Sequence, residues 1–201
     1  MKHGLLVFLM WSWALCLGCK NGSLKPDEYI LYVRNPENGL NSCVQTHQAK
    51  FCIQLEPSHY LALKELKGKE LSGLKLDKEL EKFQDYLYVD FSIKLNDGSS
   101  RLLDKLDTIN YNKNYTYLAF GLGSNIKLLN QHDTLNCLMY QFVDNYGISP
   151  EYHFQMIFDR PEELYGSSEY LFQFNDGVFN FEPLSVPISI KALQKLPTLK
   201  L

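Results

Sequence analysis

Residues 86–95, YLYVDFSIKL, alternate between apolar and more polar side chains. In an extended chain, one face would carry Leu87, Val89, Phe91, Ile93 and Leu95. Because successive side chains of a β-strand point to opposite faces, the pattern predicts a strand with one buried and one solvated face. Strands of this kind are typical of antiparallel sheets, since the strands of parallel sheets are buried on both faces.

Short strand-like runs recur along the chain and are separated by turn residues. The sequences GSN at 123–125 and NDG at 175–177 predict hairpin turns. We expect a hairpin over 42–55 and strands at 29–33, 115–121, 126–130, 134–143, 153–159, 170–175, 178–182 and 186–190. About ten short strands at this spacing predict a mainly β fold, either an antiparallel β-sandwich or an open barrel.

Residues 57–85 interrupt the strand pattern. Pro57 opens SHYLALKEL, and Leu76, Leu80 and Phe83 then follow at helical spacing with Lys and Glu between them. The stretch predicts a small helical insertion that covers one end of the sheet.

Two cysteines lie in the expected hairpin over 42–55. If Gln45 pairs with Lys50, the antiparallel register places Cys43 directly opposite Cys52. This geometry suits a cross-strand disulfide, and an exported protein meets oxidising conditions. A metal site that adds His47 would lack a fourth ligand, so we expect no metal and no cofactor. Cys137 is left over and is expected to be a buried free thiol.

No catalytic motif emerges from the sequence. His132 and Cys137 lie five positions apart, about 16 Å along a strand. They would also face opposite sides of that strand, which excludes a Cys–His pair with Asp133 as the orienting group. The chain also lacks HExxH, GxSxG and a P-loop. We therefore expect no catalytic residues, although folding could bring dispersed residues together.

Four tyrosines form the one candidate binding surface. Tyr86 and Tyr88 alternate on the more polar face of one expected strand, and Tyr115 and Tyr117 do so on another. If these strands were neighbours, the four rings would form an aromatic surface of the kind that binds partners. The alternative is that the tyrosines cover the sheet edge or pack beneath the helical insertion.

The N-terminus predicts export. Lys2 and His3 precede the apolar run GLLVFLMWSWALCLG, which ends at Lys20. A short basic start and an apolar segment are typical of a secretory signal, while a spanning helix needs roughly 20 apolar residues. A short membrane anchor and a plain cleaved signal peptide are the other readings. The net charge of −3 argues against nucleic acid as a partner.

Leu17-Gly18-Cys19 at the end of this run resembles the lipobox of bacterial lipoproteins. The sequences NPENGL, DTLNC and LPTLKL also resemble a group of uncharacterised lipoproteins from Gram-negative bacteria. Position −3 departs from the motif, because Cys16 stands where the family usually has Leu. The resemblance implies cleavage before Cys19 and lipid attachment to its sulfur.

The resemblance also implies the domain organisation. Residues 1–18 would be the signal peptide, 19–28 a lipidated tether and 29–201 a single β-rich domain. Two or more acyl chains hold a protein stably on a membrane. Lys20 is not the Asp that retains some lipoproteins in the inner membrane, so the outer membrane is the expected location.

These observations predict a membrane-anchored envelope lipoprotein with a non-enzymatic binding or assembly role, possible partners being other envelope proteins. The alternative is an exported hydrolase whose catalytic residues are dispersed in the sequence. A third reading is a eukaryotic secreted glycoprotein, because Asn21 and Asn114 each begin an N-glycosylation sequence.

Overall fold

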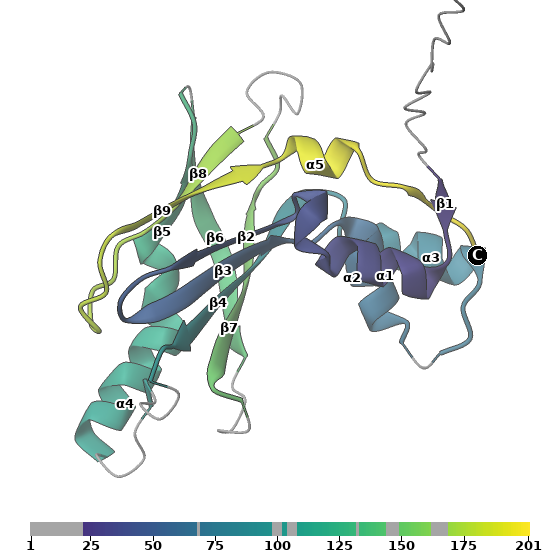
Figure 1. The fold of residues 1–201 in the computed structure, drawn as a ribbon. Coiled ribbons are helices and arrows are strands. Elements are labelled where there is room, and N and C mark those ends of the chain that lie inside the picture. Colours follow the sequence, from purple (N-terminus) through teal and green to yellow (C-terminus); the bar gives the residue numbers. More distant parts are fainter. Residues whose placement is uncertain are drawn as a thin grey trace, which may run out of the picture.

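A computed structural model describes residues 22–67, 69–97, 102–103, 108–131, 133–143, 149–161 and 169–201. Its largest element is an antiparallel sheet with the strand order β2-β3-β4-β7-β6-β5-β8-β9 (Figure 1). The strands are β2 (Asn41–Gln45), β3 (Ala49–Leu55), β4 (Tyr86–Leu95), β5 (Ile126–Leu129), β6 (Thr134–Val143), β7 (Glu151–Asp159), β8 (Glu169–Phe174) and β9 (Leu184–Ser189). The prediction of a mainly β, antiparallel fold is confirmed.

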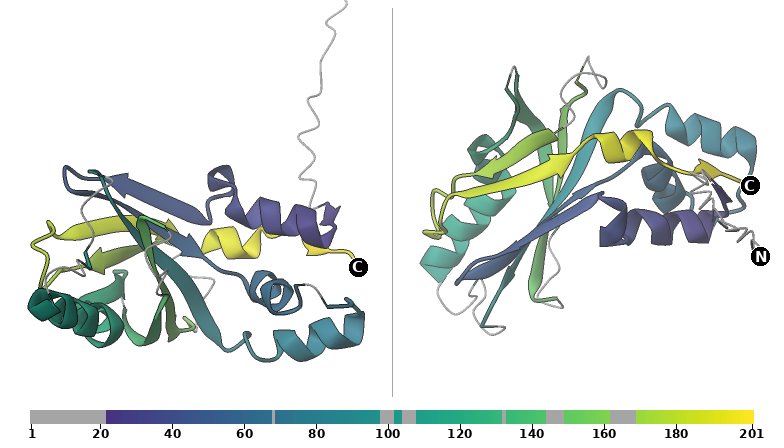
Figure 2. Two further views of the ribbon diagram at one scale, coloured as in Figure 1. Left: turned by 90° about the horizontal axis from the view of Figure 1, so that it is seen from below. Right: turned by 45° about the horizontal axis from the view of Figure 1, so that its top comes forward.

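The sheet curls until its two edge strands approach each other (Figure 2). The turn between β2 and β3 contacts the segment before β9 at this seam. His47 Nδ1 lies 3.4 Å from Glu182 Oε1, and the Gln48 amide donates to the carbonyl of Asn180 over 3.2 Å. A single sheet that nearly closes on itself corresponds to the open barrel of the two predicted architectures.

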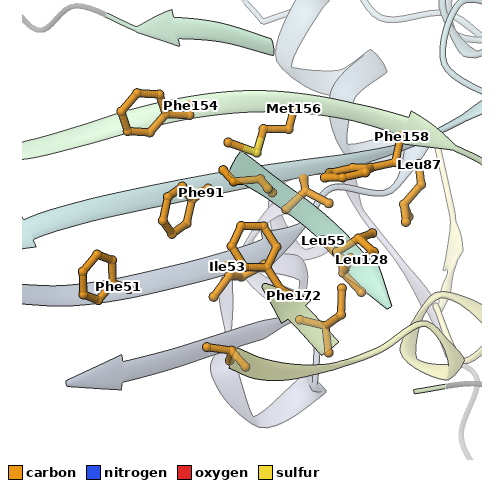
Figure 3. Close-up of a cluster of buried hydrophobic side chains, with 14 of the residues drawn as sticks. Phe51, Ile53, Leu55, Leu87, Phe91, Leu128, Phe154, Met156, Phe158 and Phe172 are labelled. Atoms are coloured by element: carbon orange, nitrogen blue, oxygen red, sulfur yellow. The ribbon is translucent and has the colours of Figure 1, made fainter. Parts of the chain in front are cut away.

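The inner face of the sheet forms one aromatic-rich core. Phe91 of β4 is fully buried, and its ring lies 5.0 Å from the ring of Phe172 and 6.0 Å from that of Phe154, measured between centroids. Figure 3 shows these rings gathered between strands that face each other across the curled sheet. The apolar side chains of residues 86–95 therefore face the inside of the barrel, and the alternate side chains lie on its outer face. The predicted buried face of this strand is confirmed.

The hairpin of β2 and β3 has the predicted register. Cys43 pairs with Cys52, Val44 with Phe51, and Gln45 with Lys50. A disulfide joins the two cysteines, whose Cα atoms are 4.1 Å apart. It lies on the face opposite Phe51, which points into the core.

Helices lie at both ends of the sheet (Figure 1). Near the chain termini lie α1 (Pro26–Arg34), α2 (Ser58–Glu65) and α3 (Gly73–Leu80), and α4 (Thr108–Thr116) lies at the other end. Short helical segments complete the described chain: η1 (Pro36–Asn38), η2 (Tyr117–Gly121), η3 (Leu122–Asn125) and α5 (Lys191–Gln194). The helical insertion predicted over 57–85 corresponds to α2 and α3 and is confirmed.

The expected strand at 29–33 is wrong, because this stretch lies in α1. Pro26 occupies the first turn, where its fixed φ and missing N–H suit a helix start. The Glu28 carboxylate accepts the backbone N–H of Lys25 over 2.9 Å. Tyr29 and Val33 are buried one helical turn apart, so helical spacing decides the conformation. This helix begins at Pro26, within the stretch 19–28 that was expected to be a tether.

The expected strand at 115–121 is also wrong. Residues in this stretch belong to α4 and η2, and GSN at 123–125 lies in η3 rather than in a hairpin turn. Leu118 and Leu122 are fully buried at a spacing of four, which turns this segment onto the core as a helix.

Residues 178–182 do not form the expected strand. The carboxylate of Asp176 accepts the backbone N–H groups of Val178, Phe179 and Phe181. Asn180 adopts a left-handed conformation with φ of 57°. Amide groups committed to a side chain are not available to a strand ladder, so β8 and β9 are joined by a longer loop.

A second, two-stranded sheet joins the first and the last strand of the described residues. In it, β1 (Ser23–Leu24) runs parallel to β10 (Thr198–Leu199), and Lys200 donates its backbone N–H to the carbonyl of Leu24 over 2.8 Å. Within the described ranges, no helix has the length and apolar character needed to cross a membrane.

Candidate functional site

A cavity of about 640 Å³ lies near the chain termini. Its wall is built from the β3–α2 connection, the start of β4, the end of α3, the residues after β7 and the segment that leads from α5 into β10. Small-molecule sites in proteins span about 300–1,000 Å³, so this space has the size of a ligand pocket.

Most of the cavity wall is apolar. The start of β4 contributes Leu87, which is buried and also belongs to the core shown in Figure 3. Pro57 and Pro161 are buried, and the C-terminal segment adds the half-buried Leu196 and Leu199. Such a wall favours apolar parts of a ligand because burying them removes hydrocarbon surface from water.

Tyr29 of α1 places a hydroxyl group beside this cavity. The residue is 1% exposed, and its hydroxyl has no hydrogen-bond partner among the described residues. Burial raises the pKa of Tyr29 to about 12, so the phenol is neutral at physiological pH. The ring of His59 lies 6.1 Å from that of Tyr29, and burial lowers the pKa of His59, with Asp77 opposing the shift. Burial therefore favours the uncharged form of both groups.

Arg160 supplies a positive charge to the cavity wall. Its side chain is exposed and donates one N–H to the carbonyl of Gln84, another lining residue. A guanidinium group carries five N–H donors. None of the described carboxylates forms an ion pair with Arg160, which leaves donors for a ligand.

Glu56 supplies the negative charge of the wall. It is 7% exposed, and its Oε1 lies 2.9 Å from Nζ of Lys64. Burial raises the pKa of Glu56, while the charge of Lys64 acts in the opposite direction. Glu56 also lines a second cavity of about 180 Å³, whose wall includes Met139 and Tyr140 of β6.

The outer face of the sheet carries a separate titratable network. His153 of β7 lies with Nδ1 2.9 Å from Oδ2 of Asp90 and with Nε2 3.8 Å from Oε2 of Glu151. Ser92 donates its hydroxyl to the Glu151 carboxylate over 2.8 Å. The hydrogen bond with Asp90 raises the pKa of His153, against the effect of burial. None of these four residues lines either cavity.

The four predicted surface tyrosines do not form one surface. Tyr86 and Tyr88 line the large cavity. Tyr115 lies on α4, at the other end of the sheet, where its ring packs against Phe142 (Figure 1). Tyr117 lies in η2, and its hydroxyl accepts hydrogen bonds from the Asn125 side-chain amide and from the backbone N–H of Gly177. The predicted aromatic surface required two neighbouring strands. It does not form, because residues 115–121 are helical.

Cys137 is the cysteine outside the disulfide in the described part of the chain. Cys137 is a free thiol, as expected, but it is half-buried rather than fully buried. Burial raises its pKa to about 11, so it is a poor nucleophile. His132 and Cys19 lie outside the described residues. Within the described chain, no group of three or more His, Cys, Asp or Glu is placed to hold a metal.

The glycosylation sequence at Asn114 lies in α4. The Asn114 amide nitrogen, to which a glycan would be attached, donates to the carbonyl of Leu102 over 3.0 Å. The side chain is half-buried. This packing favours an unmodified Asn114, since N-glycans are attached to accessible surface positions.

Comparison of the chain with family models, with curated proteins and with solved structures found no match.

Sequence reasoning missed the residues that give the cavity its chemistry. Tyr29, His59 and Arg160 come from segments far apart in the chain, and no short motif connects them. The pair of Asp90 and His153 depends on the pairing of β4 with β7. Only Asp90 carried a signal, as the one acidic residue on the polar face of the alternating strand.

Proposed function

We propose that this protein is a membrane-anchored envelope lipoprotein with a binding role rather than a catalytic one. Its large cavity would hold a mainly apolar small molecule, which it could store or deliver to another envelope protein. The sequence Leu17-Gly18-Cys19 supports lipid attachment at Cys19. Lys20 supports placement in the outer membrane, because the Asp of inner-membrane retention is absent at that position.

The observation that carries the binding role is the size of the cavity, together with a wall that is apolar over most of its area. Its volume of about 640 Å³ and its wall of Leu, Pro and Tyr side chains match the usual character of small-molecule sites.

The side chains of the cavity favour binding over hydrolysis. Ser58 donates its hydroxyl to the carbonyl of Phe83 over 2.9 Å, which directs the proton away from His59. Nucleophilic catalysis needs a nucleophile within hydrogen-bond reach of a base. The described lining residues show no such pair.

The alternative function is an exported hydrolase that uses the outer-face network. The pair of Asp90 and His153 has the geometry of an oriented general base. Ser92, however, is 4% exposed and bonds with Glu151. A hydrolase would lose its activity in a His153→Gln variant, so esterase and peptidase assays of that variant test the alternative.

Intact-mass spectrometry of the protein from native membranes tests the anchor. We expect an N-terminal Cys19 that carries acyl groups, together with the two-hydrogen deficit of the disulfide between Cys43 and Cys52. A chain that retains Met1 and carries no lipid would refute the lipoprotein proposal.

Binding of the apolar fluorescent dye N-phenyl-1-naphthylamine tests the cavity. We expect saturable binding that Leu196→Trp abolishes by filling the space. Leu171→Trp is the matched control, because Leu171 is 43% exposed on β8 and does not line the cavity. Equal dye binding by both variants would show that the dye does not enter the cavity.

A further inference from the structure

We propose that the large cavity binds a single-chain anionic amphiphile, such as a fatty acid, with its tail inside and its carboxylate at Arg160. This inference rests on the proposed binding function and names the ligand class. It follows from how charge is distributed over an otherwise apolar wall.

The apolar part of the wall accounts for the tail. Leu87 and Pro57 are buried, and Leu80, Leu196 and Leu199 are half-buried. Branched aliphatic and proline side chains provide dispersion contacts and no hydrogen bonds, which suits a hydrocarbon chain. Burial favours the uncharged forms of the Tyr29 and His59 side chains, which is compatible with a hydrocarbon chain beside them.

The two charged side chains fix the direction of the ligand. Glu56 is buried in the wall and its carboxylate is already bonded to Lys64 Nζ, so this part of the wall offers an anionic head no cationic partner. Arg160 is exposed and pairs with no described carboxylate. An acidic head therefore finds its cationic partner at Arg160, on the solvent-accessible part of the wall.

The guanidinium group of Arg160 also fits the shape of a carboxylate. Its planar fork can donate two parallel hydrogen bonds, a geometry that lysine cannot reproduce. One N–H is committed to the Gln84 carbonyl, which fixes the side chain and leaves the remaining donors for the head group. Gln84 itself also lines the cavity, so this hydrogen bond holds Arg160 at the cavity wall.

Displacement of N-phenyl-1-naphthylamine tests this ligand class. Palmitate and hexadecanol have the same chain length, and only palmitate carries a charge at pH 8. Hydrogen bonds to charged groups are the stronger ones, so we expect palmitate to bind about ten- to a hundred-fold more tightly than hexadecanol. Arg160→Gln should remove that difference, with both displacement constants corrected for the dye affinity of the variant itself. Lys50→Gln, an exposed lysine on β3 that does not line the cavity, is the charge-matched control.

The outcomes separate the inference from the function on which it rests. If the dye binds but palmitate and hexadecanol displace it equally, the ligand class is wrong and the binding function stands. If the dye fails to bind both the membrane-purified protein and the Cys19→Ser variant, the binding function itself is wrong. Dye binding only after Cys19→Ser would show that the cavity holds the protein's own acyl chain, which would also overturn the anionic ligand.

Discussion

His153 Nδ1 lies 2.9 Å from Asp90 Oδ2, so a histidine on β7 and an aspartate on β4 are joined across the outer face of the sheet. Glu151 approaches the other ring nitrogen, and Glu56 adds a weaker negative field. The protonated form of His153 is therefore the one that this environment stabilises.

This pair predicts that the protein loses stability as the pH rises. The pKa of His153 is raised above its ordinary value of 6.5. Its contribution is fully present below that value and is lost as the pH increases through the higher folded pKa. Because the His153 side chain is 40% exposed, we expect only about 0.5 kcal/mol. Urea unfolding between pH 5.5 and 8.5 should show this change in the native protein and not in His153→Gln.

The control for this prediction is His47→Gln at the seam of the sheet. His47 and Glu182 are both largely exposed, so their ion pair should contribute little to stability at any pH. A pH dependence that survives in His153→Gln and disappears in His47→Gln would contradict the assignment.

The disulfide between Cys43 and Cys52 should stabilise the fold chiefly by restricting the unfolded chain. The two residues are separated by nine positions, and the chain-entropy model gives roughly 2–3 kcal/mol for such a loop. We expect this loss in urea unfolding of a Cys43→Ser/Cys52→Ser variant. Addition of a reductant should lower the stability of the native protein and leave the variant unchanged, and a reductant effect on the variant would contradict this reason.

Gly123 should not tolerate a side chain. A Cβ atom at this buried position would lie 2.5 Å from Cδ1 of Tyr140. The Tyr140 ring is also held in place, because its hydroxyl accepts the backbone N–H of Leu122 over 3.0 Å. Gly123→Ala should therefore cost about 1–3 kcal/mol in chemical denaturation.

Two further variants separate the Gly123 clash from general effects of alanine. Gly22→Ala places its Cβ in open space and should leave the stability unchanged. In a Tyr140→Ala background, the added cost of Gly123→Ala should fall toward zero, since the clashing ring is absent. A full cost in that background would show that the ring is not the cause.

Cys137 should react slowly with thiol reagents. With Cys16→Ser and Cys19→Ser in place, it is the one free thiol left beside the disulfide. At pH 8, a pKa of about 11 leaves so little thiolate that the reaction with Ellman's reagent should be roughly a hundredfold slower than for free cysteine. Addition of urea should restore the fast rate, and fast labelling of the native protein would refute the raised pKa.

The sequence predicts the fold best where local pattern and tertiary burial agree. Residues 86–95 alternate because one face of β4 lies inside the barrel, and the cysteine pair followed from a short hairpin with a single sensible register. Residues 115–121 were wrongly predicted as a strand because their Tyr, Leu and Phe side chains suit a buried strand as well as a buried helix. Burial of Leu118 beside Leu122 decided the helix, and that depends on contacts that are distant in sequence.

The candidate site was beyond the reach of local patterns. The cavity joins α1, the β3–α2 connection, β4 and the C-terminal segment, so its lining exists only once these elements have packed. Arg160 follows directly after β7 and has no sequence neighbour that marks it as a ligand contact. Asp90 and His153 likewise became partners only through strand pairing.

The pairing of β1 with β10 has a mechanical consequence for the proposed lipid-anchored form of the protein. A force transmitted to Ser23 from its N-terminal side would act on the pairing of β1 with Thr198 and Leu199 before it reached the large sheet. Thr198 and Leu199 also form part of the cavity wall. In the proposed lipid-anchored form, tension at the N-terminal side would therefore act on the cavity wall before it acted on the large sheet.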